Sequence, residues 1–188
     1  MFSIVRGMYK DLREEITALT LASDTPAIAI DGLSADEPEA AFPVRLAFTA
    51  SPLPTKKPRS VMDIDALEYI RVAIANGIDM FDRVLPTSAG RDRPVFTYKG
   101  AYSLKKLDNT FDQNPIAAVH THTVCRTYSR VYMRRLCKTR EILCSMSARY
   151  HNRHGLRNGV KTARAAVEES GFSVCKADFL REYTADTV

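Results

Sequence analysis

Residues 126–164 read RTYSRVYMRRLCKTREILCSMSARYHNRHGLRNGVKTAR and carry the strongest signals for both structure and function. Eleven of these residues are Lys or Arg, and Glu141 is the single acid. So many like charges weaken a compact state unless an anionic surface lies against them. We therefore expect this stretch to belong to a folded, phosphate-binding part of the molecule.

The same stretch predicts a strand followed by a helix. Every second residue from 142 to 148 is apolar or small: Ile142, Cys144, Met146 and Ala148. The residues between them would lie on the opposite face. This period of two predicts a strand. Residues 151–159 predict a turn, after which Asn158 can cap a helix that ends at Gly171.

The residues upstream predict the rest of a mixed domain. Alternation predicts strands at 44–49, 95–104 and 116–123, and Ser60 with Asp63 resembles a capping box that opens a helix. The predicted fold class is therefore α+β. We expect a single compact domain over residues 44–188, with a central antiparallel sheet flanked by helices.

Residues 1–43 predict a separate arm. An apolar stripe at helical spacing over residues 3–20 predicts an amphipathic helix, formed by Val5, Met8, Leu12, Ile16 and Leu19. Residues 21–43 are rich in Ala, Asp, Glu and Pro, which is typical of a flexible acidic linker. Ile28 and Ile30 interrupt this linker, and we expect them to anchor self-association on a neighbouring copy.

Charge and composition narrow the class of protein. The first fifty residues hold four bases and eight acids, which leaves 23 bases and 14 acids in the remainder. No window approaches the ~18 apolar residues that span a bilayer. The N-terminal residues lack a secretory pattern, and the four cysteines form no CxxC pair. These features favour a cytosolic protein with reduced thiols that reaches membranes only from the inside.

The basic body predicts a surface for phosphate groups without sequence preference, on a membrane or a nucleoprotein. Tyrosines interleave with the arginines, but no RNA-recognition signature accompanies them. The predicted binding residues are Lys56, Lys57, Arg59, Arg126, Arg130, Arg134, Arg135, Lys138, Arg149 and Arg153. A sequence-independent RNA-binding protein, such as a nucleocapsid protein or silencing suppressor, is the alternative.

The four histidines form the one constellation that suggests catalysis. His120 and His122 are spaced so that they share one face of a predicted strand, and His151 and His154 lie in the predicted turn. The HxH pair resembles that of JAMM-type isopeptidases, but Ser129 falls one place short of that pattern. A metal-dependent hydrolase is therefore a further alternative. We expect no bound metal and no cofactor, because no acid or thiol is clearly placed beside the pair.

The order of these elements resembles the matrix proteins of rhabdoviruses over residues 42–174. The resemblance lies in VRLAFTASPLPTKKPRSVMDIDALEYIRVAI (44–74), GRDRPVFTYKG (90–100), VHTHTVCRTYSRVY (119–132), TREILCSMSARYHN (139–152) and VKTARAAVEESGFSV (160–174).

This resemblance implies a non-enzymatic viral structural protein. Such a protein self-associates, bridges the inner face of the envelope to the helical nucleocapsid, condenses it and supports budding. Its partners would be other copies of itself in a lattice, the nucleocapsid, the anionic membrane face and a viral glycoprotein tail, with RNA bound only non-specifically. Its location would be the virion, beneath the envelope, and the host cytoplasm, membrane inner face or nucleus.

Overall fold

The chain forms two compact units, residues Met1–Val84 and Leu85–Val188. The computed structural model describes residues 2–4, 9–33, 41–62, 64, 67–82, 94–97 and 100–183. We expected a boundary between residues 43 and 44, which falls inside the first unit. Among the described residues, no helix combines the length and the apolar character needed to cross a bilayer.

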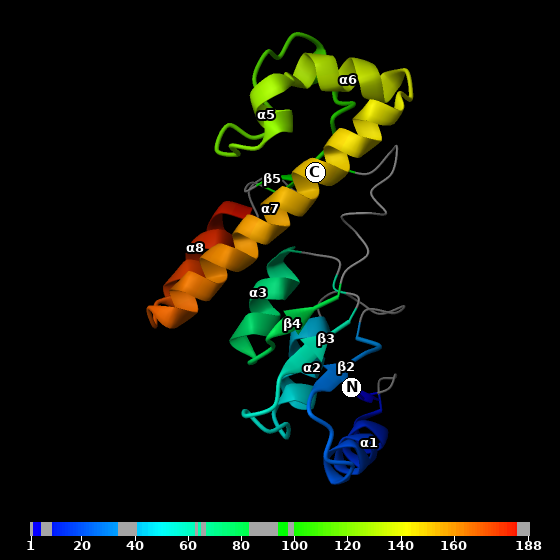
Figure 1. Ribbon diagram of the computed structural model, residues 1–188, viewed down its shortest axis with the longest axis vertical. Helices are drawn as coiled ribbons and strands as arrows, with labels where there is room; N and C mark the ends of the chain where they lie inside the picture. The colour runs from blue at the N-terminus through cyan, green and yellow to red at the C-terminus, as the bar shows by residue number, and fades with distance from the viewer. Residues whose placement is uncertain are drawn as a thin grey trace. The chain divides into compact units, whose positions relative to one another are not determined.

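The first unit alternates strands with helices around a parallel sheet (Figure 1). Its elements are β1 (Phe2–Ile4), α1 (Lys10–Ala22), β2 (Ile28–Ile30), α2 (Phe42–Ala50), β3 (Arg59–Val61), α3 (Leu67–Ala75) and β4 (Met80–Phe81). The sheet order is β1-β2-β3-β4 and every pair is parallel. Each strand therefore lies beside the strand that precedes it in the chain, with one helix in between.

This sheet differs from the antiparallel sheet that we expected. Residues 44–49, the predicted first strand, belong to helix α2. The helix buries Phe42, Leu46, Thr49 and Ala50, which recur at helical spacing, and leaves Val44 69% exposed. The apolar residues at helical spacing over 42–50 therefore determine the structure, and the alternation over residues 44–49 does not. A single α+β domain over 44–188 stays a prediction.

The middle of the sheet forms the core of the first unit. Ile28, Ile30 and Val61 are at most 1% exposed, because parallel strands are covered on both faces. Ile28 and Ile30 therefore belong to strand β2 and not to a flexible linker. This burial makes them unavailable as anchors for a neighbouring copy, which corrects the predicted self-association residues.

Truncating Ile30 should thus affect stability and not assembly. We expect Ile30→Ala to lower the free energy of unfolding by about 2–5 kcal/mol, because it leaves a cavity in a dry core. The control Val44→Ala, at an exposed helical position, should stay within about 0.5 kcal/mol. Denaturant unfolding measures both. Equal effects of the two substitutions would show that β2 is not central to the core.

Helix α1 does not bury the apolar face that the sequence predicted. Leu12 and Leu19, from the predicted apolar stripe, are 48% and 65% exposed, whereas Arg13 is only 3% exposed. Val5 and Met8 lie outside the described residues. The Arg13 guanidinium donates to the carbonyls of Asp31 and Gly32, at 3.4 and 3.3 Å. Burial and the nearby Arg45 charge lower the pKa of Arg13.

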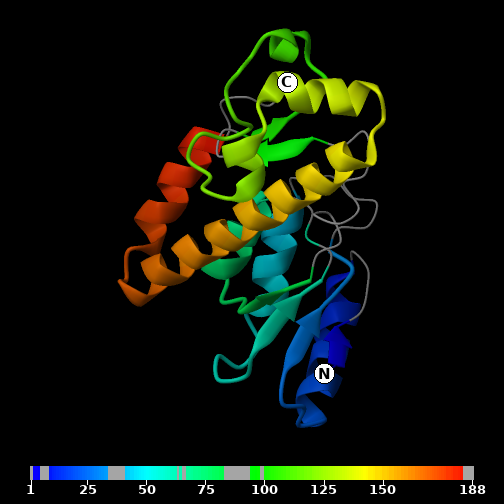
Figure 2. The ribbon, with the colours of Figure 1, turned by 45° about the horizontal axis from the view of Figure 1, so that its top comes forward.

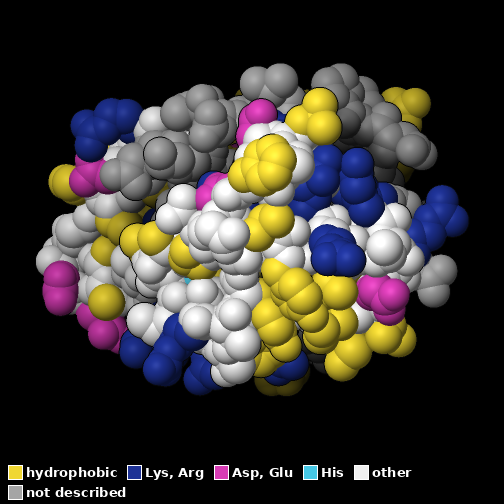
Figure 3. All heavy atoms as spheres, turned by 90° about the horizontal axis from the view of Figure 1, so that it is seen from above, with side chains coloured by type: hydrophobic (Ala, Val, Ile, Leu, Met, Phe, Trp, Pro, Cys, Tyr) yellow, Lys and Arg dark blue, Asp and Glu magenta, His cyan; other side chains and the backbone are white. Residues whose placement is uncertain are grey.

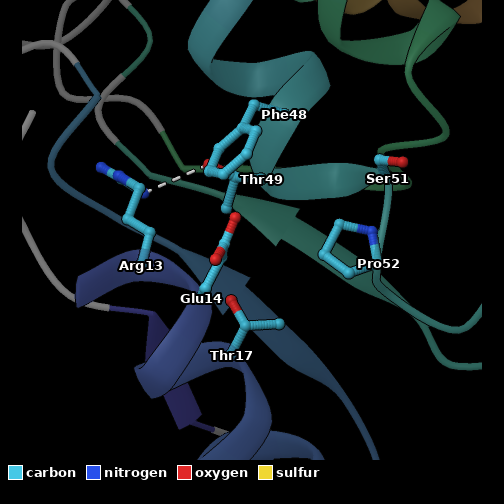
Figure 4. Close-up of a pocket in the computed structure, with 7 residues that line it drawn as sticks. All are labelled: Arg13, Glu14, Thr17, Phe48, Thr49, Ser51 and Pro52. Carbon is cyan, nitrogen blue, oxygen red and sulfur yellow. Dashed lines mark hydrogen bonds between the residues drawn. The ribbon is translucent and has the colours of Figure 1, made fainter. Parts of the chain in front are cut away.

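A pocket of about 350 Å³ lies beside this arginine. Figure 4 shows its lining residues, Arg13, Glu14, Thr17, Phe48, Thr49, Ser51 and Pro52. The Arg13 side chain also reaches Thr49 Oγ1 at 3.4 Å, so it ties α1 to α2. We interpret Arg13 as the residue that holds the loop after β2 in place.

The second unit is mainly helical (Figures 1 and 2). Strands β5 (Val95–Thr97) and β6 (Gly100–Tyr102) form an antiparallel pair. They are followed by the 3-10 helix η2 (Leu107–Thr110), α5 (Thr123–Thr127), α6 (Arg130–Lys138), α7 (Ile142–Glu168) and α8 (Phe172–Tyr183). Helix α7 packs against β5, α5, α6 and α8.

Helix α7 replaces the predicted strand at 142–149 and the predicted turn at 151–159. Its buried residues follow a helical stripe, which consists of Cys144, Ser147, Ala148, His151 and Asn152. The apolar Ile142 and Met146 are 72% and 58% exposed. A disulfide joins Cys137 to Cys144 across the turn between α6 and α7, where we expected reduced thiols. Cys125 and Cys175 are not joined in a disulfide.

Candidate functional site

Three histidines and one cysteine meet in the interior of the second unit. The nitrogen and sulfur atoms of His120, His122, Cys125 and His151 all lie within 4.8 Å of one another. His122 Nε2 and Cys125 Sγ are each 3.3 Å from His151 Nδ1. Ligand atoms around a tetrahedral zinc are ~3.3–3.6 Å apart, given its bond lengths. The cluster therefore has the donor types and spacing of a metal centre.

Two short sequence features bring these side chains together. In HTHTVC (120–125), His120 and His122 immediately precede helix α5 and Cys125 lies within it. Helix α7 carries His151 into the same space from the other side. Gly155, one turn further along α7, permits close approach, because a Cβ there would lie 3.2 Å from Cε1 of His120.

A backbone contact fixes the tautomer of His151. Its Nε2 lies 2.9 Å from the carbonyl oxygen of Phe96, which can only accept a hydrogen bond. Nε2 therefore carries the proton, and the lone pair of Nδ1 faces His122 and Cys125. A ligating histidine commonly donates its second N–H in this way. The neighbouring Asn152 accepts from the Phe96 N–H, so α7 holds β5 through polar side chains.

Burial keeps the imidazoles neutral. It lowers the pKa of His151 to about 3 and that of His122 to about 4, and it also lowers the pKa of His120. Burial raises the pKa of the Cys125 thiol. Neutral imidazoles are ready to bind a cation, whereas the thiol must lose its proton when it binds one.

One buried nitrogen of the cluster lacks a partner among the described residues, and it is not the His122 nitrogen that faces His151. His122 Nδ1 is buried and has no hydrogen-bond partner within the part of the chain that the structure describes. A buried polar atom without a partner is costly unless an ion or water satisfies it. We had expected no metal because no thiol was clearly placed beside the HxH pair. The structure removes that reason, since Cys125 lies in the cluster.

The predicted basic surface is only partly available. Arg59 is 6% exposed, and its guanidinium donates to the Leu53 carbonyl at 2.6 Å. Arg130 pairs with Asp112 at 3.0 Å. Arg59 therefore supports the fold, which corrects its predicted role in binding, whereas the predicted role of the half-buried Arg130 stays a prediction.

Of the other predicted basic residues, two form contacts within the protein and six have exposed side chains. Lys57 pairs with Asp24 at 2.9 Å, and Arg134 Nε donates to the Lys106 carbonyl at 2.9 Å. The exposed ones are Lys56, Arg126, Arg135, Lys138, Arg149 and Arg153. On the face in Figure 3, Lys and Arg side chains gather beside hydrophobic ones, and the histidines are almost hidden.

Two acidic residues at the edge of the sheet were not predicted as site residues. Asp31 follows β2 and Asp82 follows β4, so both lie at the carboxyl edge of the parallel sheet. Met62, after β3, lies between them in register, which places their backbones about 10 Å apart, two strand spacings. We missed this edge because neither β2 nor β4 was predicted as a strand.

Comparison with known proteins assigns the chain to a family. The model of the family described as "TGT: Queuine tRNA-ribosyltransferase" matches residues 1–185. A queuine tRNA-ribosyltransferase of Treponema denticola is 41% identical over 184 residues, covering 97% of this chain and 48% of that protein. One from Caldanaerobacter subterraneus subsp. tengcongensis is 36% identical, covering 97% of this chain and 49% of that protein. The chain thus spans about half the length of the curated relatives it matches.

These matches overturn the viral interpretation. The resemblance to rhabdovirus matrix proteins is wrong, and so are the predicted nucleocapsid, envelope and glycoprotein partners and the virion location, because the relatives are bacterial. The expectation of a non-enzymatic structural protein is wrong as well, because the relatives carry the name of an enzyme. The two alternatives, a sequence-independent RNA-binding protein and a metal-dependent hydrolase, do not fit the matches either. The chain belongs to the queuine tRNA-ribosyltransferase family.

Proposed function

We propose that this chain forms part of an enzyme that transfers a ribosyl group in tRNA to queuine, as the name of its relatives describes. The observation that carries the proposal is the order of the parallel sheet, β1-β2-β3-β4. In closed βα barrels each strand also lies beside its neighbours in sequence. The first unit therefore corresponds to one sector of such a barrel. In the curated relatives, whose length the chain covers only by about half, the remaining residues would supply the other strands.

The carboxyl edge of the sheet is then the place for the chemistry. Barrel enzymes build their active sites at this edge. Transfer at the C1 carbon of a sugar passes through a positively charged transition state, which a carboxylate can stabilise or trap covalently. Asp31 and Asp82 are the described carboxylates that follow strands there.

Of these two acids, Asp82 is the better nucleophile candidate. Asp31 Oδ1 accepts a hydrogen bond from the Gly32 N–H at 2.6 Å, which occupies it in shaping its own loop. Asp82 is exposed, and its backbone N–H donates to the Val61 carbonyl at 3.1 Å, so the strand ladder fixes its position. We assign Asp82 to attack C1 of the ribose, where the bond to the base already present in the tRNA breaks and that base leaves with the electron pair. A nitrogen of queuine then attacks C1, loses its proton and displaces the carboxylate. We assign Asp31 to the support of the edge.

The second unit would hold a metal that organises its helices. His120, His122, Cys125 and His151 make a closed set of four ligands, which is typical of a structural zinc site. A bound metal would cross-link α5 to α7. Because all four positions would be taken by side chains, the metal would not activate a water molecule. The Phe96 carbonyl would orient His151 from outside the ligand set.

Gly155 should prove necessary for this arrangement. We expect Gly155→Ala to weaken metal binding about tenfold, because the added Cβ pushes the His120 ring that it would meet at 3.2 Å. Gly159→Ala, on the same helix, meets nothing within 4 Å and should leave metal affinity unchanged. Competition with a metal chelator measures both. If the two variants bind the metal equally well, the close approach of Gly155 to the His120 ring is not needed for metal binding.

The exposed bases of α6 and α7 would contact tRNA phosphates. Arg135, Lys138, Arg149 and Arg153 are exposed. We expect Arg149→Gln with Arg153→Gln to reduce tRNA affinity and to lower the slope of log affinity against log salt by about 1–2. The control is Arg181→Gln on α8, an exposed arginine paired with Asp178 at 2.6 Å. Electrophoretic mobility shifts at several salt concentrations measure this, and equal slopes for both variants would exclude these arginines.

A chimera tests the proposed function as a whole. This chain replaces its matched part in the Treponema denticola relative, and incorporation of labelled queuine into tRNA is measured. We expect the chimera to incorporate the label, because the carboxyl edge and the metal centre both come from this chain. A chimera that folds and binds tRNA but incorporates no queuine would contradict the proposal.

A further inference from the structure

A fourth histidine stands beside the cluster. His154 lies one helical turn after His151 on α7, and it is half-buried. Its ring centroid is 4.5 Å from that of His122 and 5.4 Å from that of His120. The corresponding distances from His151 are 5.3 and 4.8 Å. His154 is thus as close to the HxH pair as the ligand histidine of the same helix.

The cluster therefore offers more donors than one metal requires. The donor atoms of three imidazoles and one thiol lie within 4.8 Å of one another, and the ring of His154 lies directly beside His120 and His122, whereas a structural zinc takes four ligands. Asn158 Nδ2 lies 3.4 Å from His154 Nδ1 and holds that side of the ring. The opposite nitrogen, Nε2, is the one that this contact leaves to other partners. A ring fixed through one nitrogen is suited to ligation through the other.

We propose that His154 is a reserve ligand that takes the place of Cys125 when the thiol is absent. The inference rests on the proposed metal centre. His151 cannot be the ligand that is replaced, because the Phe96 carbonyl anchors it and both HxH rings face it. The thiol contributes the only sulfur of the described cluster, so its loss converts a three-nitrogen, one-sulfur centre into a four-nitrogen centre.

Cobalt substitution distinguishes the two ligand sets. Co²⁺ added to the metal-free chain shows strong visible bands when four-coordinate and a near-ultraviolet charge-transfer band when a thiolate is bound. We expect wild type to show both. Cys125→Ser should lose the charge-transfer band but keep the four-coordinate bands and one cobalt per chain. His154→Ala alone should resemble wild type.

The double variant gives the decisive comparison. Cys125→Ser with His154→Ala should bind cobalt more than about tenfold more weakly than Cys125→Ser, since even an outer-shell partner is worth that much. Cys125→Ser with His154→Gln repeats the comparison with a polar side chain, and circular dichroism confirms folding. Equal affinity of single and double variants would overturn the proposal, as would loss of metal from His154→Ala alone. A wild-type chain that binds no cobalt would overturn the metal centre itself.

Discussion

Asp82→Asn should reduce queuine incorporation by the chimera roughly 1,000-fold or more, while tRNA binding stays unchanged. The amide has nearly the shape of the carboxylate, but it can neither attack the ribose nor stabilise its positive charge. The side chain lies at the carboxyl edge of β4, where the backbone ladder to β3 holds it in place. Steady-state incorporation of label and a separate tRNA-binding assay measure the two effects.

The matched control lies at the other end of the same strand. Asp79 precedes β4, and its Oδ2 accepts a hydrogen bond from the Arg59 N–H at 2.9 Å. Asp79→Asn should change incorporation by less than about tenfold, because its amide oxygen still accepts that bond. Asp31→Asn should fall between the two. If Asp79→Asn costs as much as Asp82→Asn, the position of the carboxylate at the edge has no special role.

His151→Ala should abolish metal binding and destabilise the second unit. It removes a proposed ligand and also the hydrogen bond to the Phe96 carbonyl that joins α7 to β5. A metal present at about a thousand times its Kd stabilises the folded chain by about 4 kcal/mol, and all of that is lost with the metal. Metal content after gel filtration and thermal unfolding with and without chelator measure the change.

The addition of chelator provides the internal control for this variant. Wild type should lose thermal stability when chelator is added, and His151→Ala should not respond. His154→Ala should respond like wild type. A wild-type protein whose unfolding is unaffected by chelator would show that the four side chains are held by packing alone.

The sequence indicated the charge of the second unit but not its partner. The basic bias of residues 126–164 is a true property of α6 and α7, and several of its bases are exposed. Net charge reports on non-specific attraction to phosphates and not on fold. An anionic membrane, a nucleocapsid and tRNA all present the same groups, so charge alone could not distinguish them.

The strands of the first unit were hidden from pattern reading by their length and burial. β2 consists of Ile28, Ala29 and Ile30, and all three are buried. A strand of three buried residues shows no alternation. In α7 the alternation was misleading, because His151 and Asn152 point inward and make polar contacts with Phe96, while Ile142 is exposed. Polar side chains that form buried hydrogen bonds thus take positions in the helix where apolar residues are usually expected.

The cluster of three histidines and one cysteine was half visible in the sequence. The spacing H-x-H-x-x-C over residues 120–125 was present, but no thiol was judged to be clearly placed beside the HxH pair. His151, 26 residues after Cys125, was assigned to a turn, so nothing brought it to the pair. Only the continuous helix α7 and its packing against α5 place it there.

X-ray absorption at the metal edge tests the central claim most directly. The purified chain should contain one metal per molecule, with nitrogen ligands at about 2.0–2.1 Å and one sulfur at about 2.3 Å. Cys125→Ser should remove the sulfur contribution. A chain without bound metal, or a metal without a sulfur neighbour, would contradict the assignment of His120, His122, Cys125 and His151 as its ligands.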